Sequence, residues 1–278
     1  MIKRKTFTLL ELLVAIAIIG ILVSLLIPHL NRGRRVAKTV VCMNQQKQIF
    51  FAFALYHDDN NGYFPVGKDE DDDISWDDLL GAYDGRNLTE TDMNASSFQE
   101  DDNLNKAYEL YQCPANIQYF DGKRVLKSYS VSRHFNNDRS VLGVMSFTNH
   151  DGDTSTPKVA WSLKLTEINK PSRFISMTEF QNQWNQLGNG GTQGTFTLGY
   201  ITEKYGPTNA DSTHGLDGGI KGFFPHDPKN YKLNYLHGDG HVSTRSFPNT
   251  LSHPERFFDG NNYPNQYIID TAWNAAEE

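Results

Sequence analysis

One short stretch near the C-terminus has the residue types and spacing of a metal site. His237, Asp239 and His241 alternate there with two glycines. On an undistorted strand, residues two and four apart share a face, so two imidazoles and a carboxylate can converge on a zinc ion. The glycines, however, favour a turn or a bulge, which breaks this alternation. We therefore expect a structural turn here, with the zinc site as the alternative.

A second oxygen-rich stretch runs through residues 58–62. Asp58 and Asn60 have the spacing with which a calcium loop begins, but the bidentate Glu that closes an EF-hand is absent. The run Asp-Asp-Asn-Asn-Gly is also typical of a turn that ends a helix. We expect the helix-ending turn.

The chain has none of the residue patterns that mark common enzymes. It lacks a Gly-x-Ser-x-Gly nucleophile turn, a His-Glu-x-x-His zinc helix and a phosphate-binding loop. The formal net charge of −7 over 278 residues argues against nucleic-acid binding, which needs a basic surface. We expect neither an enzyme nor a nucleic-acid-binding protein.

The N-terminal region is the most distinctive part of the sequence. From Phe7 to Ile27 it is apolar apart from Glu11, and a bilayer-crossing helix takes about 20 residues. Residues 1–6 form a basic leader that is expected to stay in the cytoplasm. Amphipathic periodicity continues the helix to about His57. Its expected packed face comprises Val36, Val40, Met43, Phe50, Ala54 and His57.

Glu11 is out of place in a simple membrane anchor. An isolated carboxylate in an apolar segment is costly and needs a partner. A free amino group on Phe7, from the same chain or a neighbouring one, can serve. A cleaved secretory signal is also disfavoured, because no small residues follow the apolar core around Pro28.

The stretch from Thr6 to Pro28 resembles the N-terminal segment of type IV pilins and of type II secretion pseudopilins. The resemblance implies that a prepilin peptidase removes the leader before Phe7 and methylates the new amine. It also implies that Glu11 guides the stacking of helices in a filament. Gly20 and Pro28 match the family's positions as well.

Thr6 is the one departure from this resemblance, because the family has Gly immediately before the cut. Threonine is bulkier and stiffer than glycine, which leaves two alternatives for processing. Either the leader is cleaved as in the family, or it is kept and Lys3, Arg4 or Lys5 of an adjacent copy neutralises Glu11.

By the same resemblance the chain beyond the apolar segment is exported. Cys42 and Cys113 would then meet an oxidising environment, where an even number of cysteines predicts one disulfide. Two buried free thiols are the alternative. The basic residues just beyond the apolar segment are expected to face lipid headgroups or solvent. They are Arg32, Arg34, Arg35 and Lys38.

Residues 58–278 predict one globular α+β head. Ser75 and Asp78 have the spacing of a capping box that opens a short helix, and a second short helix ends near Tyr111. Strand candidates then follow one another without long helices between them. This indicates an antiparallel sheet with long loops, packed on the amphipathic half of the first helix, residues 31–57. The candidates are residues 128–132, 141–147, 159–163, 174–179, 195–201 and 231–245.

Several further motifs resemble those of a pilin-like family abundant in Planctomycetes and Lentisphaerae. They are the run 42–48, the helix exit 56–65, Cys113-Pro114 and Asp239-Gly240-His241-Val242. In that family a histidine precedes the Asp-Gly pair, with nine residues between them. Here Lys229 occupies that position, and the nearest upstream histidine is His226. Some pseudopilins hold calcium in the globular domain, so a structural Ca²⁺ at residues 58–62 or 151–153 is an alternative to simple turns.

Asn87 and Asn94 each begin an Asn-x-Ser/Thr triplet in a polar stretch, which is the acceptor pattern for N-linked glycans. We expect both side chains to be exposed.

Together these features predict a structural subunit of a type IV pilus-like extracellular filament. Residues 7–30 would span the inner membrane before assembly and form the filament core afterwards, with Gly20–Ile27 partly unwound. The expected partners are further copies of the chain, a prepilin peptidase and an assembly machinery. The alternatives are a pseudopilin of a type II secretion system and a membrane-anchored module that binds calcium or glycans.

Overall fold

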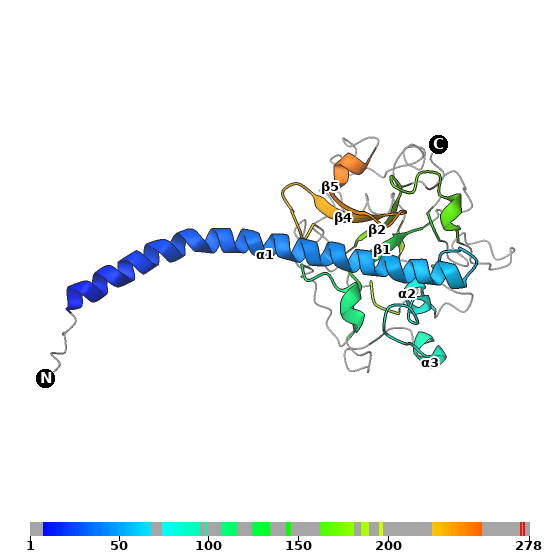
Figure 1. The fold of residues 1–278 in the computed structure, drawn as a ribbon, viewed down its shortest axis with the longest axis horizontal. Coiled ribbons are helices and arrows are strands. Elements are labelled where there is room, and N and C mark those ends of the chain that lie inside the picture. Colours follow the sequence, from blue (N-terminus) through cyan, green and yellow to red (C-terminus); the bar gives the residue numbers. More distant parts are fainter. Residues whose placement is uncertain are drawn as a thin grey trace, which may run out of the picture.

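A single long helix, α1 (Leu9–Asp59), extends from a head domain that packs along one side of its C-terminal half (Figure 1). At about 1.5 Å per residue the helix is about 75 Å long. The computed structural model describes residues 8–67, 74–94, 98, 107–115, 124–133, 143–145, 162–180, 185–188, 195–196, 224–251, 273 and 275. The helix expected over residues 7–57 is confirmed.

Both ends of α1 follow from local chemistry. Thr8 is its N-cap, and its side chain accepts a hydrogen bond from the Glu11 amide. At the C-terminus the Asn60 side chain donates to the Tyr56 carbonyl at 2.8 Å. Asn61 and Gly62 then adopt positive φ angles of 54° and 83°, which end the helix.

The remaining helices are short and belong to the head. They are α2 (Trp76–Leu79), α3 (Glu90–Met93) and the 3₁₀ turns η1 (Ala107–Tyr111), η2 (Leu165–Glu167) and η3 (Phe247–Thr250). The capping box predicted at the start of α2 is confirmed, because the Ser75 amide and hydroxyl donate to Asp78 Oδ2 at 2.9 and 2.8 Å.

The sheet has the strand order β3-β1-β2-β4-β5. Its strands are β1 (Tyr129–Ser132), β2 (Ile175–Glu179), β3 (Thr195–Phe196), β4 (Lys232–His237) and β5 (Val242–Ser246). The four strands β1, β2, β4 and β5 pair antiparallel, which confirms the α+β class. The two-residue β3 differs from the expectation, since it pairs parallel with β1.

Other strand candidates are only partly described. The candidate at 231–245 is a hairpin of β4 and β5 rather than one strand. Within 141–147 and 159–163 the described residues form isolated bridges, in which Met145 pairs with Arg133 and Ser162. The rest of these two candidates, and residues 197–201, lie outside the described residues.

The C-terminal half of α1 packs against β4, β5 and η1, and buries one stripe of side chains. The stripe comprises Cys42, Gln46, Ile49, Ala52, Phe53 and His57. The predicted face was wrong at its start, since Val36 and Val40 are each 58% exposed. The buried face is the one that carries Cys42, and Val40, two positions earlier, lies about 200° around the helix from it.

The hairpin turn between β4 and β5 lies directly against α1. Gly240 has a φ of +87°, and a Cβ at this position would lie 2.3 Å from the Phe50 ring. Both the backbone conformation and the close approach therefore require glycine.

Buried charges connect α2 to neighbouring segments of the head. The Asp77 carboxylate forms ion pairs with Lys127 and Arg86, and all three side chains are fully buried. Asp77 also accepts a hydrogen bond from the Gly188 amide at 2.8 Å. Burial and the adjacent Asp77 carboxylate raise the pKa of Asp78 to about 8, so Asp78 is mainly protonated at neutral pH.

Candidate functional site

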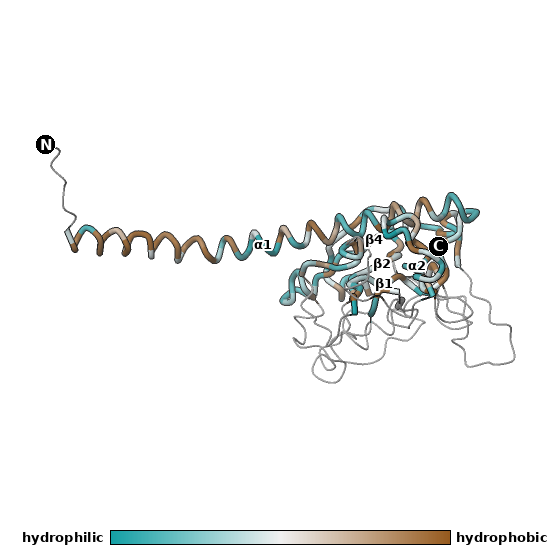
Figure 2. The backbone as a smooth tube through the Cα atoms, turned by 90° about the horizontal axis from the view of Figure 1, so that it is seen from below, coloured by the Kyte–Doolittle hydropathy of each residue, from teal (hydrophilic) through white to brown (hydrophobic). Residues whose placement is uncertain are grey.

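The N-terminal half of α1 is an apolar surface that lies exposed outside the head. All large apolar side chains from Leu9 to Leu30 are exposed, and Figure 2 shows this half as a nearly continuous apolar segment beyond the head. Among the described residues α1 is the one helix long and apolar enough to cross a membrane, by length and composition. Such a surface is stable in lipid or against other apolar helices.

Glu11, the one acidic residue of this surface, closes the first turn of α1. Its Oε2 atom accepts hydrogen bonds from the Thr8 amide and the Thr8 hydroxyl, both at 2.9 Å. This capping box is a partner that the sequence reasoning missed, although Thr-x-x-Glu before an apolar run is its signature. Thr6 and Phe7, the residues of the expected processing site, lie outside the described residues.

Gly20 and Pro28 lie within the continuous helix. A Cβ at Gly20 would meet nothing within 4 Å, so the monomer has no steric need for glycine there. Pro28 lacks the amide hydrogen that would bond to the Ser24 carbonyl. The neighbouring Ser24 hydroxyl donates to the Ile21 carbonyl at 2.7 Å. The helix is therefore continuous but lacks one backbone hydrogen bond at Pro28.

A disulfide joins the second half of α1 to the head. Cys42 and Cys113 are bonded, with a Cα–Cα distance of 5.2 Å and 71 positions between them in sequence. This confirms the predicted pairing. Beside it, the Gln45 side chain donates to the carbonyls of Glu109 and Gln112 at 2.7 and 2.9 Å. The helix and the head are thus one covalently linked unit.

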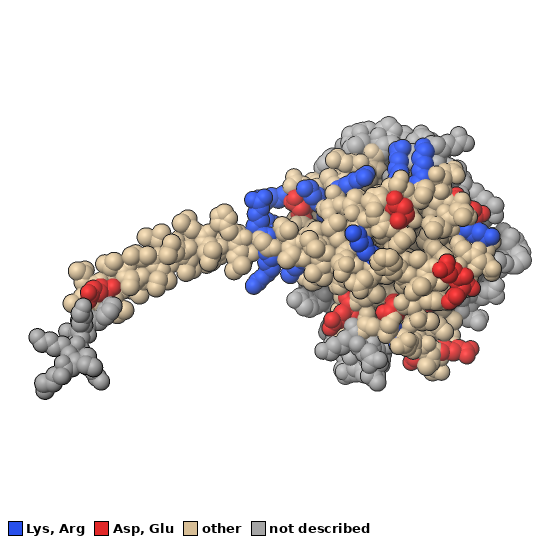
Figure 3. Space-filling model, in the orientation of Figure 1, with Lys and Arg blue, Asp and Glu red and all other residues tan. Residues whose placement is uncertain are grey.

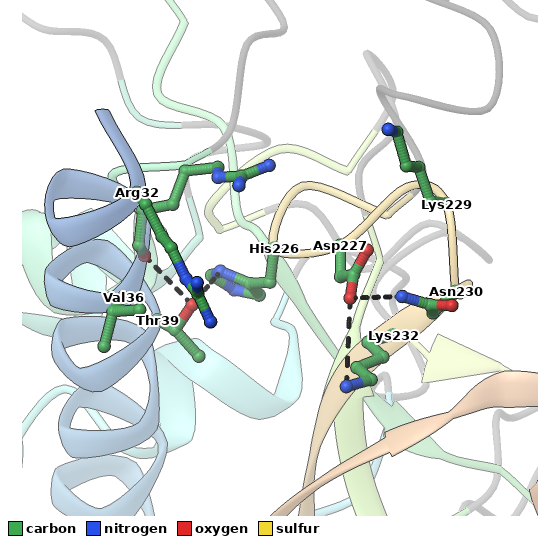
Figure 4. Close-up of a pocket in the computed structure, with 9 residues that line it drawn as sticks. Arg32, Val36, Thr39, His226, Asp227, Lys229, Asn230 and Lys232 are labelled. Atoms are coloured by element: carbon green, nitrogen blue, oxygen red, sulfur yellow. Dashed lines mark hydrogen bonds and ion pairs between the residues drawn. The ribbon is translucent and has the colours of Figure 1, made fainter. Parts of the chain in front are cut away.

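A buried polar cluster adjoins this disulfide. His226 Nε2 lies 2.6 Å from Glu179 Oε1 and 3.6 Å from Cys113 Sγ. Asn234 donates to both Glu179 oxygens, each at 2.9 Å. His226 Nδ1 contacts the Thr39 hydroxyl of α1 at 3.0 Å (Figure 4). His226, the nearest histidine upstream of the family's motif position, therefore lies at the junction of helix and head.

Basic side chains surround a pocket where α1 enters the head. The pocket measures about 530 Å³, and Figure 3 shows Lys and Arg side chains gathered at this junction. Its charged residues are Arg32, Arg35, Asp227, Lys229 and Lys232 (Figure 4). Burial opposes ionisation of Asp227, but hydrogen bonds from Asn230 and the charges of Lys232 and Arg35 lower its pKa overall. With four cations and one anion, the pocket favours anionic groups such as phosphate.

The zinc candidates lie at the β4–β5 hairpin turn. His237 uses both ring nitrogens within the protein, at 3.1 Å from the Arg173 carbonyl and 2.8 Å from the Ser243 hydroxyl. His241 Nδ1 instead lies 2.6 Å from Asp239 Oδ1, and the two imidazole rings stack at 4.0 Å. Burial and His241 lower the pKa of His237 to about 4. This arrangement favours the structural turn.

The calcium candidates lie at the C-terminal end of α1. Asp58 is exposed, and Asn60 caps the helix through its own side chain. The neighbouring Asp59 accepts a hydrogen bond from the Tyr83 hydroxyl at 2.8 Å. These contacts match the expected helix-ending turn, and residues 151–153 lie outside the described residues.

Both glycosylation candidates are exposed, as expected. Asn87 has a positive φ of 52°. Asn94 follows α3, and its amide nitrogen donates to the Glu90 carbonyl at 2.8 Å. Glycan attachment at either residue stays a prediction.

Two family comparisons agree with this anatomy. Residues 1–27 match the prokaryotic N-terminal methylation motif. Residues 31–169, half of the chain, match the family described as "Protein of unknown function (DUF1559)". No curated protein and no solved structure gives a significant match. These matches agree with an exposed apolar helix that is joined to a disulfide-linked α+β head. The chain belongs to the DUF1559 family and is a type IV pilin-like protein.

Proposed function

We propose that this protein is the repeating subunit of a type IV pilus-like filament at the cell surface. The observation that carries the proposal is the exposed apolar half of α1, Leu9–Leu30, which the head does not cover. Its one acidic residue, Glu11, lies in the first turn. A monomer with this surface needs a membrane or other copies of the same helix around it.

Assembly would exchange one apolar environment for another. In the inner membrane the N-terminal half of α1 is covered by lipid, and in the filament it is covered by the same half of neighbouring subunits. Burial of the apolar side chains is kept throughout, so extraction from the membrane does not expose them to water. Identical contacts repeated from subunit to subunit generate a helical fibre.

Glu11 would set the axial register of this packing. Both Thr8 groups donate to one of its carboxylate oxygens, Oε2, and a carboxylate has about four acceptor sites, so Glu11 retains acceptor capacity for a cation. The amine of Phe7 in a neighbouring subunit is the partner we propose after processing. If the leader is kept, Lys3, Arg4 or Lys5 of the neighbour takes that role.

Mass spectrometry of the N-terminal peptide from sheared surface fibres tests this function. We expect the chain in the fibres to begin at Phe7 with a methylated amine. If the chain in the fibres begins at Met1, the protein is still a filament subunit, but the proposed cleavage before Phe7 is overturned. If the protein is absent from fibres and confined to the inner membrane, the proposal of a pilus subunit is overturned. The protein would then be a pseudopilin or an anchored binding module.

A further inference from the structure

The side chains around the Cys42–Cys113 bond form a cluster that filament assembly does not use. One ligand-type atom from each of Cys42, Cys113, Glu179 and His226 lies within 4.8 Å of the others, and all four residues are buried. Among the described residues, this is the one group of His, Cys, Asp and Glu side chains that converges in this way. The four come from α1, the segment after η1, the end of β2 and the segment before β4.

Hydrogen bonds of Thr39 indicate that Nδ1 of His226 carries a proton, while Nε2 is the nitrogen beside the sulfurs. The Thr39 hydroxyl donates to the Arg35 carbonyl at 3.1 Å, so its oxygen accepts from His226 Nδ1–H at 3.0 Å. Nε2 therefore faces Glu179 Oε1 at 2.6 Å and Cys113 Sγ at 3.6 Å. In the disulfide form a proton between Nε2 and Oε1 satisfies both atoms. Without that proton, two lone pairs point toward the same space, which suits a cation.

We propose that these four side chains bind a thiophilic divalent cation, with zinc as the best fit, when the disulfide is reduced. Two thiolates, one imidazole and one carboxylate are a complete tetrahedral donor set for zinc. Zinc bonds of about 2.3 Å to sulfur and about 2.0 Å to nitrogen place those two ligands about 3.5 Å apart. Cys113 Sγ and His226 Nε2 are 3.6 Å apart already.

The surroundings hold two of these ligands in position. Asn234 donates to both oxygens of Glu179, each at 2.9 Å. Thr39 fixes the ring of His226 through Nδ1, which is the outer contact that metal-binding histidines commonly make. The Cys113 amide donates to the Ser128 hydroxyl at 2.9 Å, which fixes the backbone of one cysteine. The cluster is therefore preorganised by residues that would not bind the ion.

The redox step balances with a phosphine as the reductant. The S–S bond breaks, the two sulfurs receive two electrons and two protons, and the phosphine leaves as its oxide with oxygen from water. Zinc then displaces the two thiol protons and the proton between His226 and Glu179. The bound ion joins α1 to the head at the same place as the disulfide, so the link between them exists in both redox states.

Metal binding by the purified full-length protein tests the proposal. The oxidised and the phosphine-reduced protein are each equilibrated with Zn²⁺ in detergent, and bound metal is measured after removal of free ions. We expect one zinc per reduced chain and none in the oxidised chain, with α-helical content unchanged by circular dichroism. Cobalt in place of zinc should give the thiolate charge-transfer absorption of a tetrahedral site. A reduced, folded protein that binds no more zinc than the oxidised protein would overturn the proposal.

Two histidine variants separate the site from general thiol binding. Replacing His226 with Gln should weaken zinc binding to the reduced protein at least tenfold, because it removes the nitrogen ligand. The matched control is His237→Gln, which changes a buried histidine at the other end of β4, where both ring nitrogens bind protein groups. Equal zinc affinity in these two variants would contradict the assignment. If His226→Gln fails to fold, the comparison of oxidised and reduced wild-type protein still decides the question.

Discussion

The two halves of α1 are continuous in the backbone but differ in almost every other respect. From Leu9 to Leu30 the helix is exposed on all sides, and its one acidic side chain is satisfied within the first turn. From Cys42 to His57 it is packed on the sheet, linked by a disulfide and flanked by buried polar contacts. The apolar side chains of the first half are exposed, whereas the second half is packed against the head along one face.

One helix can therefore serve two tasks, assembly through its first half and attachment of the head through its second half. Burying one large apolar side chain contributes about 1.5–3 kcal/mol, so the second half holds the head in place through many such contacts. The first half has the same kind of side chains, but only lipid or neighbouring subunits would bury them. Changes in the first half should therefore affect assembly, and changes in the second half should affect the stability of the head.

The largest effect on assembly is expected at Glu11. Glu11→Ala removes both the cap and the charge and should reduce fibres to the level of background. Glu11→Gln keeps acceptors and donors for the capping box but removes the charge, so it should also abolish or strongly slow assembly. The measurement is the amount of subunit in sheared fibres relative to the membrane. The control is Thr8→Ala, which removes the cap but keeps the charge and should still assemble. Normal fibres with Glu11→Gln would contradict the role of charge.

The disulfide should give the largest effect on the head. Cys42 and Cys113 are 71 positions apart, and closing a loop of this length contributes about 4 kcal/mol in the chain-entropy treatment. The double change to Ser, measured without added metal, should lower the free energy of unfolding of the head by roughly that amount. Urea unfolding followed by Trp fluorescence gives this value. An unchanged midpoint would show that the sulfurs contribute nothing to the link between helix and head.

The pH dependence of head stability should depend on Asp78. Its pKa is about 8 in the folded head and about 3.9 in an unfolded chain. The folded state therefore binds the proton more tightly, and the stability it contributes is complete below pH 4 and is lost as the pH rises to about 8. Asp78→Asn should flatten this slope and raise the free energy of unfolding at pH 8, by at most about 5 kcal/mol for a pKa difference of about four units.

A matched control for this prediction is Asp92→Asn in α3. Asp92 occupies the same capping-box position relative to Thr89, but it is not buried, and hydrogen bonds from Thr89 lower its pKa. Its replacement should produce no gain at pH 8. Equal responses of Asp78→Asn and Asp92→Asn would assign the effect to capping rather than to burial.

The smallest effect on the monomer is expected at Gly20. Gly20→Ala should stabilise the helix by about 1 kcal/mol or less, since alanine is the better helix former and no atom lies within 4 Å of the new Cβ. Assembly should nevertheless become slower if Gly20–Ile27 unwinds in the fibre. Gly33→Ala is the control, because its Cβ also meets open space but it lies beyond the apolar half. Equal fibre yields from the two variants would argue against unwinding.

Local patterns of the sequence were enough to predict much of this structure. The length and periodicity of α1, the capping box at Ser75 and the strands β1 and β2 all depend on neighbouring residues. The disulfide followed from the number of cysteines. The local pair Thr8 and Glu11 has an equally local signature, since Thr-x-x-Glu before an apolar run is typical of a capping box.

Features that depend on packing were not predictable from these patterns. Val36 and Val40 fit the helical periodicity but stay exposed, because the head packs on the face of α1 that carries Cys42, Gln46 and Ile49. His226 gave no local signal, because its partners Thr39, Cys113 and Glu179 come from three other parts of the chain. Only the folded topology brings them together.

Cryo-electron microscopy of the isolated fibres would show whether the first half of α1 is an assembly surface. We expect a core in which the Leu9–Leu30 segments of neighbouring subunits pack together, with the heads outside and Glu11 beside a cationic group of the next subunit. Fibres in which these segments lie apart and the heads make the only contacts would contradict it.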